Sequence, residues 1–338
     1  MDLLSEEDLA LIDALQINPR ASWEQLGTAV GLSAISVARR WRRLNGAGLA
    51  WSGATLGPAL LRGAFIELSC APGSAAEIAE TLCERPEVIT VGRSLGDFDV
   101  YAISASTDPL RSAQSLLAGL GDQGIWRARA QLYTHVFGGP GWRLSVLNKT
   151  QSAELSRRGV APAHPRGVDE RERRLVLALQ ADARRSNKEL AIELDMSPQA
   201  VPNLLERAER RGFLTLRVDV ARQLAGYPLA GLLWVAVPGA LTEDAGRWFA
   251  ALPENRFCAL VVSSSNMVVI ANLREPEQLG RIAQSFSEAF PQATVTEQRI
   301  ITSMPKVQGR MLHDDGRTDR LVRYDPWAQE PDAGARGV

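Results

Sequence analysis

The sequence predicts an α+β protein in which two winged helix-turn-helix domains alternate with two ferredoxin-like βαββαβ sensing domains. The first observation behind this prediction is an internal repeat. Residues 8–49 align without a gap with residues 172–213, and 11 of the 42 aligned positions are identical, whereas chance gives about three. The second observation is that each copy of the repeat is followed by short, alternating apolar segments typical of strands. The chain is therefore predicted to be a tandem duplication.

The first predicted domain, residues 1–52, begins with three short helices. Ser5 is a candidate N-cap, and Ser22 forms a capping-box pattern with Gln25. Gly31 ends the second helix, and Ser33 supplies the N-cap of the third. Three short helices with this spacing predict a helix-turn-helix domain.

The third of these helices carries four arginines and no acidic residue between Ser33 and Leu44, in a chain of net charge −1. Such a helix can offer donors to base edges while its guanidinium groups neutralise phosphates. A merely solvated basic face is the alternative, but the three-helix spacing and its repetition favour DNA binding. Double-stranded DNA is thus the predicted partner, and the predicted contact residues are Ser33, Ile35, Ser36, Arg39, Arg40, Arg42 and Arg43.

The second helix-turn-helix domain, residues 169–216, keeps the pattern but not the basic surface. Its third helix is expected to begin at Ser197-Pro198, which leaves Pro202 near the end of the first turn. Glu206 and Glu209 offset much of its positive charge. We therefore expect the first domain to dominate DNA affinity, with the second weak, differently specific or purely structural. The expected outward positions are Gln199, Ala200, Asn203, Leu204 and Arg207, and Gln199, Asn203 and Arg207 are the candidate secondary DNA contacts.

Residues 58–138 and 222–307 are the predicted sensing domains. In the first, the pattern is strand, helix, strand, strand, helix, strand, which gives a four-stranded antiparallel sheet with two helices on one face. The other face must be covered, so we expect pairing with another such sheet, within the chain or in a homo-oligomer. The six expected elements span residues 63–70, 74–84, 88–95, 98–106, 108–120 and 125–137.

A turn between the second and third strands of this domain, Leu95-Gly96-Asp97-Phe98-Asp99-Val100, carries a resemblance to a known family. Together with Leu32-Ser33, the segment Arg39-Arg40-Trp41-Arg42-Arg43-Leu44 and the ending Gly48-Leu49, it resembles the Lrp/AsnC family of leucine-responsive, or feast/famine, regulators. The resemblance implies a transcription regulator that responds to an amino acid or another small metabolite. It also implies sheets that pair face to face and effectors bound near these turns.

The predicted ligand-binding residues are Gly96, Asp97 and Asp99. Gly96 permits a tight turn, and Asp97 can accept a hydrogen bond from an ammonium group or from backbone donors. The alternative is that the aspartates only cap the hairpin. The corresponding segment of the second copy, residues 263–269, lacks the glycine and both carboxylates, which puts ligand binding there in doubt.

The remaining segments give fewer signals. Residues 139–168 are rich in glycine, proline and polar residues and are expected to form a linker, and residues 308–338 are expected to be a disordered tail. The acidic amino terminus does not resemble a secretory signal, and no apolar run approaches the roughly 20 residues that span a membrane. We therefore expect a cytoplasmic protein with no membrane partner.

An enzyme is the main alternative function, because a related group of proteins with this two-part layout decarboxylates siroheme. Those proteins resemble one another through a histidine-rich and tryptophan-bearing stretch at the start of the sensing sheet. The corresponding segments here, residues 63–68 and 231–236, contain no histidine, and the chain has only His135, His164 and His313. Cys70, Cys83 and Cys258 show no metal-site spacing. The sequence thus predicts no catalytic residue, no metal, no cofactor and no enzyme activity.

Overall fold

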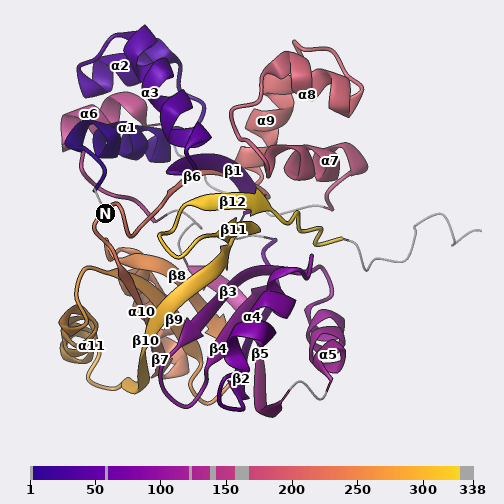
Figure 1. Cartoon of the computed structure of the whole chain (residues 1–338), viewed down its shortest axis with the longest axis vertical. Coiled ribbons are helices and arrows are strands. Elements are labelled where there is room, and N and C mark those ends of the chain that lie inside the picture. Colours follow the sequence, from indigo (N-terminus) through magenta and orange to yellow (C-terminus); the bar gives the residue numbers. More distant parts are fainter. Residues whose placement is uncertain (1–2, 58–59, 122–123, 138–141, 157–166, 328–338) are drawn as a thin grey trace, which may run out of the picture. The chain divides into compact units, whose positions relative to one another are not determined.

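The computed structural model describes residues 3–57, 60–121, 124–137, 142–156 and 167–327. They divide into two compact units, each built from segments of both copies of the repeat (Figure 1). One unit, here called the reader unit, holds both helix-turn-helix domains. The other, here called the sensing unit, holds both ferredoxin-like domains. The predicted α+β architecture is confirmed.

The first helix-turn-helix domain forms as its capping residues predict. The side chains of Ser5, Ser22 and Ser33 each accept a hydrogen bond from a backbone N–H of the following helix. Gly31 ends the second helix with φ 71°, in the left-handed region that glycine occupies without steric cost. The three helices are α1 (Glu6–Ile17), α2 (Trp23–Val30) and α3 (Ala34–Gly46).

The second domain departs from the prediction in its third helix. This helix begins at Val201 rather than at Ser197-Pro198, and its N-cap residue, Ala200, makes no side-chain hydrogen bond. The delay places Pro202 in the first turn. Backbone N–H groups there have no intrahelical acceptor, so the proline costs no helical hydrogen bond. The helices of this domain are α7 (Glu170–Leu179), α8 (Asn187–Leu194) and α9 (Val201–Arg210).

Two strands join the helix-turn-helix domains to each other. β1 (Ala50–Leu56) and β6 (Leu214–Val220) pair antiparallel along their whole length. Each strand runs past the expected end of its domain, at residues 52 and 216, because the strand from the other copy continues its hydrogen bonding. The wing of one domain is therefore completed by the wing of the other.

A buried carboxylate organises part of the expected linker. Asp13 of α1 is fully buried and accepts a hydrogen bond from Arg143 Nε at 2.7 Å. It also accepts from the backbone N–H groups of Ser145, Val146 and Leu147 at 3.1, 2.8 and 2.8 Å. Burying a carboxylate is costly unless donors surround it, and this segment supplies four of them.

The same segment adds apolar side chains to the core of the first domain. Trp142, Leu144 and Leu155 are buried against α1 and α2, and residues Lys149–Leu155 form helix α6. The prediction of a polar tether is therefore wrong for residues 142–156, which pack as part of the domain. Residues 157–166 of the expected linker lie outside the described residues.

The sensing unit contains two ferredoxin-like domains with the predicted element order. The bounds in the first domain differ from the expected ones by two residues or fewer. Its elements are β2 (Gly63–Cys70), α4 (Ala75–Cys83), β3 (Val88–Ser94), β4 (Val100–Ser104), α5 (Pro109–Leu120) and β5 (Ile125–Phe137). The second domain has β7 (Leu229–Ala236), η1 (Gly239–Leu241), α10 (Thr242–Ala250), β8 (Asn255–Val261), β9 (Met267–Leu273), α11 (Glu277–Ala289) and β10 (Thr294–Val307).

The two sensing sheets join at both edges within one chain. β5 pairs with β8 at one edge, and β10 pairs with β3 at the other. The strand order β3-β4-β2-β5-β8-β9-β7-β10 therefore closes on itself. Helices α4 and α5 cover the outer face of the first sheet, and α10 and α11 cover that of the second (Figure 1). The expected pairing of sheets thus occurs inside the molecule.

The segment after residue 307 is ordered as far as the described residues extend. β11 (Arg310–Leu312) pairs with β10, and β12 (Thr318–Leu321) follows it in the strand order. Tyr324 and Trp327 are buried, with exposed fractions of 1% and 8%. The prediction of a disordered tail is wrong for residues 308–327, because a β-turn lets the chain pair with β10 and the two aromatic side chains are buried. Residues 328–338 lie outside the described residues.

We predict that Asp13→Ala lowers the free energy of unfolding by about 3 kcal/mol, because Arg143 and three backbone N–H groups lose their acceptor. Urea denaturation followed by circular dichroism measures this change. Asp244→Ala, which removes an exposed carboxylate from α10, is the matched control and should cost less than about 1 kcal/mol. Equal losses in the two variants would contradict the role assigned to Asp13.

Candidate functional site

Helix α3 presents a mixed apolar and basic surface. Val37, Trp41 and Leu44 are buried in the domain core, so the opposite side of the helix faces solvent. Ile35 is 80% exposed, and Arg39 and Arg42 are exposed as well. The predicted contacts Ser33 and Ser36 lie at the start of the helix, where the Ser33 hydroxyl accepts from Ser36 N at 3.2 Å.

The other two arginines of α3 are paired with acids of α1. Arg40 Nη1 and Arg43 Nη2 lie 2.7 and 2.6 Å from Asp8 Oδ1, and Arg40 also binds Glu7. Burial alone would raise the pKa of Asp8, but hydrogen bonds from Arg40 and Arg43 outweigh it and lower that pKa. The four arginines predicted to contact DNA are therefore not equivalent, because two of them are paired with acids of α1, outside residues 33–44.

The second domain has a different surface at the equivalent place. Asn203 and Arg207 of α9 are exposed, and Gln199 lies exposed in the turn before the helix. Leu204 is only 3% exposed, so its prediction as an outward position is wrong. It joins Val201 on the buried face of α9, because this helix begins three residues later than expected.

One ion pair is common to both domains. Arg207 Nε lies 3.3 Å from Glu172 Oε1, and these residues align with Arg43 and Asp8 in the repeat. The contact ties the third helix to the first in each domain. Arg43 and Arg207 thus serve the domain fold as well as any contact with DNA.

Two equivalent arginines link the helix-turn-helix domains reciprocally. Arg20 Nη1 donates to the carbonyl of Ala183 at 2.6 Å, and Arg184 Nη1 donates to that of Pro19 at 2.6 Å. Arg20 also donates to the carbonyl of Arg185 at 2.9 Å, and Arg184 donates to that of Ala21 at 3.0 Å. Burial lowers the pKa of Arg184 to about 10. These contacts fix the spacing of the two domains in the reader unit.

The Gly-Asp-Phe-Asp turn of the first sensing domain has a structural role. Gly96 has φ 128°, and a Cβ there would lie 3.0 Å from Arg299 Cδ, so a larger residue would be strained and would require Arg299 to shift. Asp99 Oδ2 accepts from Cys70 N at 2.7 Å, which makes it a hairpin cap. The Asp97 carbonyl accepts from a serine hydroxyl, while its side chain is exposed.

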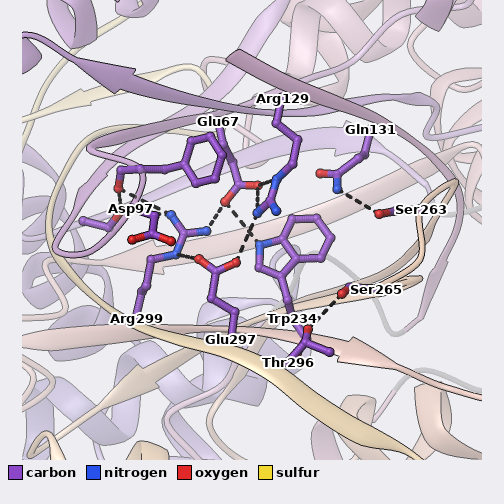
Figure 2. A network of polar contacts seen from close by, with 12 residues as sticks. Glu67, Asp97, Arg129, Gln131, Trp234, Ser263, Ser265, Thr296, Glu297 and Arg299 are labelled. Atoms are coloured by element: carbon purple, nitrogen blue, oxygen red, sulfur yellow. Dashed lines mark hydrogen bonds and ion pairs between the residues drawn. The ribbon is translucent and has the colours of Figure 1, made fainter. Parts of the chain in front are cut away.

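A buried network of charged side chains lies between the two sensing sheets (Figure 2). Glu67 Oε2 accepts from Arg129 Nε at 2.6 Å, and Trp234 Nε1 donates to Glu67 Oε1 at 3.2 Å. Arg299 forms ion pairs with Glu67 and with Glu297, and Arg129 lies 3.3 Å from Glu297. Glu67 is fully buried, and Arg299 is 4% exposed.

Strand geometry explains why these side chains meet. Successive side chains of a strand point to opposite faces. Ile66 and Leu68 of β2 pack with α4 and α5, so Glu67 points toward the second sheet. Leu233 and Val235 of β7 pack with α10 and α11 in the same way. Sequence reasoning missed this network, although an acid within the apolar 63–70 strand was a usable signal.

Aromatic and amide groups surround the charged side chains. The Arg129 and Arg299 guanidinium carbons lie 4.5 and 5.4 Å from the centre of the Phe98 ring, within the range of cation–π attraction. Gln131 donates from Nε2 to Ser263 Oγ at 3.2 Å, while its buried Oε1 has no hydrogen-bond partner in the structure. The network therefore joins strands and turns of both copies.

Within the described ranges, no group of three or more His, Cys, Asp or Glu residues is placed to hold a metal ion. Among the same residues, no helix has the length and apolar character needed to cross a membrane.

Comparison with known proteins identifies the helix-turn-helix domains. Residues 4–45 match the family model of the AsnC-type helix-turn-helix domain. The first domain is an AsnC-type helix-turn-helix domain. Residues 168–215 match a model described as winged helix-turn-helix DNA-binding. The resemblance to the Lrp/AsnC family is thus confirmed for the first helix-turn-helix domain, and no curated protein matches the chain in sequence.

One solved protein shows the same fold over nearly the whole chain, and two shorter ones match part of it. The siroheme decarboxylase NirDL, also solved with an iron-uroporphyrin III analogue, matches with a TM-score of 0.58 at 17% identity, covering 93% of this chain and 96% of that protein. A transcriptional regulator from Neisseria meningitidis in complex with L-Met matches with a TM-score of 0.34 at 26% identity, covering 39% and 90%. AsnC of E. coli matches with a TM-score of 0.33 at 17% identity, covering 38% and 91%.

The full-length match corrects one expectation. From its few histidines, the chain was expected not to be an enzyme. An enzyme shares its architecture over 93% of its length, so that expectation is overturned. The error arose because a histidine count tests only one kind of catalytic chemistry, and the two-part fold itself does not separate regulators from enzymes.

We predict that Arg184→Lys loosens the contact between the two helix-turn-helix domains. A lysine ammonium cannot span the two carbonyls that the planar guanidinium reaches. Hydrogen exchange of the backbone amides in residues 18–22 should become faster than in the unmodified protein. Arg210→Lys on the exposed side of α9 is the control, and unchanged exchange in Arg184→Lys would refute the contact's role.

Proposed function

We propose that this protein is a sequence-specific DNA-binding transcription regulator in which the first helix-turn-helix domain makes the main DNA contacts. The observation that carries the proposal is the AsnC-type domain at residues 4–45, with the exposed Ile35, Arg39 and Arg42 on its third helix. In helix-turn-helix proteins, this helix enters the major groove with its amino-terminal residues toward the bases.

The exposed residues of α3 suit that task chemically. An apolar side chain as exposed as Ile35 is costly in water but can contact a thymine methyl group in the major groove. Arg39 lies one helical turn further on and can reach a guanine edge or a phosphate. Arg42 supplies a second unpaired cation for the backbone, whereas Arg40 and Arg43 must share their charge with Asp8.

The second helix-turn-helix domain has a subordinate part in this proposal. Its exposed contact candidates are Gln199, Asn203 and Arg207, and Arg207 is also paired with Glu172. Fewer free cations mean fewer displaced counterions and a smaller electrostatic contribution to affinity. The contacts of Arg20 and Arg184 would hold this domain at a fixed distance from the first on the duplex.

We propose further that an amino acid or another small metabolite modulates DNA binding at the Gly96–Asp99 turn. Asp97 is the side chain best suited to an ammonium group, because its carboxylate is exposed. Asp99 is already engaged by Cys70 N, and Gly96 permits the close approach of Arg299. An effector at Asp97 would therefore lie next to the network between the sheets.

Arg39→Ala should weaken binding to duplex fragments selected from genomic DNA. The slope of log affinity against log salt should fall by about one unit if Arg39 contacts a phosphate. If it contacts a base, the cost should be about 1–3 kcal/mol, confined to the preferred sequence. Fluorescence anisotropy at several salt concentrations measures both quantities. Arg247→Ala, on an exposed surface of the sensing unit, is the control, and equal behaviour of the two variants would count against the proposal.

Asp97→Asn should abolish the rise in melting temperature that an effector produces, with little change in the melting temperature of the free protein. Asp99→Asn should instead lower the melting temperature without effector, because Cys70 N loses a charged acceptor. A thermal-shift screen over the twenty amino acids, each at millimolar concentration, tests both variants. A ligand response that survives in Asp97→Asn would place the effector site elsewhere.

Decarboxylation of siroheme is the second candidate function, and the full-length similarity to NirDL favours it. Arg129 and Arg299 are cations of the kind that bind substrate carboxylates, but both are paired with acids in this structure. Anaerobic incubation with siroheme, followed by absorption and mass spectrometry, distinguishes the two functions. Release of CO2 from siroheme would establish the enzyme, and unchanged siroheme together with salt-sensitive duplex binding would support the regulator.

A further inference from the structure

We infer that the buried network between the sensing sheets determines which sheets pair, favouring first with second and disfavouring either sheet with another copy of itself. The partner surface is thus a second sensing sheet with complementary charged and aromatic side chains. This inference does not depend on the proposed function, because it concerns only the assembly of the sensing unit.

Strand registers define which residues of the two copies are equivalent. Glu67 lies opposite Arg129 across β2 and β5, and Trp234 lies opposite Glu297 across β7 and β10. Glu67 is therefore equivalent to Trp234, and Arg129 to Glu297. The next pairs along the same strands, Phe65 with Gln131 and Leu232 with Arg299, make Gln131 equivalent to Arg299.

The two seams of the closed sheet support the same equivalence. Tyr133 pairs with Val261 at the β5–β8 seam, and Ile301 pairs with Ser94 at the β10–β3 seam. Tyr133 is equivalent to Ile301, and Val261 is equivalent to Ser94. An approximate twofold axis therefore relates the two sheets.

Two contacts of the network join equivalent positions. Trp234 Nε1 donates to Glu67, and Arg129 forms an ion pair with Glu297. Positions that contact their own equivalents lie about the twofold axis, so in a pair of identical sheets each would meet a copy of itself. The side chains at these two positions therefore determine whether an alternative pairing of sheets is favourable.

A pair of two first sheets would place like charges together. Glu67 would face Glu67 and Arg129 would face Arg129. The second cation that Glu67 now binds, Arg299, would be replaced by the neutral Gln131. Like charges that face each other are destabilising, and the cost is larger where water is excluded.

A pair of two second sheets would be equally mismatched. Trp234 would face Trp234, so neither indole N–H would have the carboxylate that it now binds. Glu297 would face Glu297, and the cation Arg129 would be missing. Such repulsive contacts select against the wrong partner, and only the first–second pairing satisfies both positions.

Two full-length variants test the inference. In the first, W234E/E297R/R299Q gives both sheets the network residues of the first copy. In the second, E67W/R129E/Q131R gives both sheets the residues of the second copy. Each variant contains only mismatched sheets, but the two chains together can form matched pairs with each other.

We expect neither variant alone to give a soluble protein with the melting temperature of the wild type. Co-expression with different affinity tags should give a soluble, equimolar complex of the two variants, detected by capture on one tag and by native mass spectrometry. The wild type carrying the same two tags should give no such complex, because its sheets are matched within the chain.

The control exchanges an exposed ion pair of α10, Glu243 with Arg247, as E243R/R247E, which should leave the melting temperature unchanged. The inference is overturned if either three-residue variant alone is soluble with wild-type stability. It is overturned equally if co-expression yields no complex. Insolubility of the single variants does not obscure the test, since rescue by co-expression is the measured result.

Discussion

Each sensing sheet has helices on one face only, and this constraint shapes the sensing unit. The uncovered faces carry large side chains such as Phe65, Tyr101 and Trp234, which the structure buries almost completely. Burial of that much apolar surface is the main favourable term in folding. The two sheets of the duplicated chain bury their uncovered faces by facing each other, and they share backbone hydrogen bonds at both seams. No sheet edge is then left unpaired along those seams.

The two copies differ at the contact between the sensing sheets, whereas the ion pair inside each helix-turn-helix domain is kept. The ion pair of Asp8 with Arg43 has its counterpart in that of Glu172 with Arg207, since each domain must tie its third helix to its first. Between the sheets, equivalent positions instead carry different residues, such as Glu67 in one copy and a tryptophan in the other. A duplicated chain can use such asymmetry, whereas a symmetric homodimer has the same residue at both positions.

The same architecture serves different chemistry in other proteins. Similarity to NirDL over nearly the whole chain shows that helix-turn-helix and ferredoxin-like domains in tandem also form an enzyme. Side chains therefore decide function on this fold. In this protein, side chains of α3 and of the Gly96–Asp99 turn are accessible, while the charged groups between the sheets pair with one another. This difference is the physical basis for the proposal that recognition occurs at the surface and sheet pairing in the interior.

Local sequence patterns determined most helices and strands and the order of the domains, but α6, β11 and β12 were not predicted. Capping residues such as Ser22 and a left-handed glycine such as Gly31 act within one turn, so their effect is visible in the sequence. The delayed start of α9 also has a local cause in Pro202. Tertiary structure decided the pairing of the two wings, the donors around Asp13 and the network at Glu67. Most of those interactions join residues more than one hundred positions apart, and Glu67 and Arg129 are 62 apart. No local periodicity specifies which distant group will satisfy a buried charge.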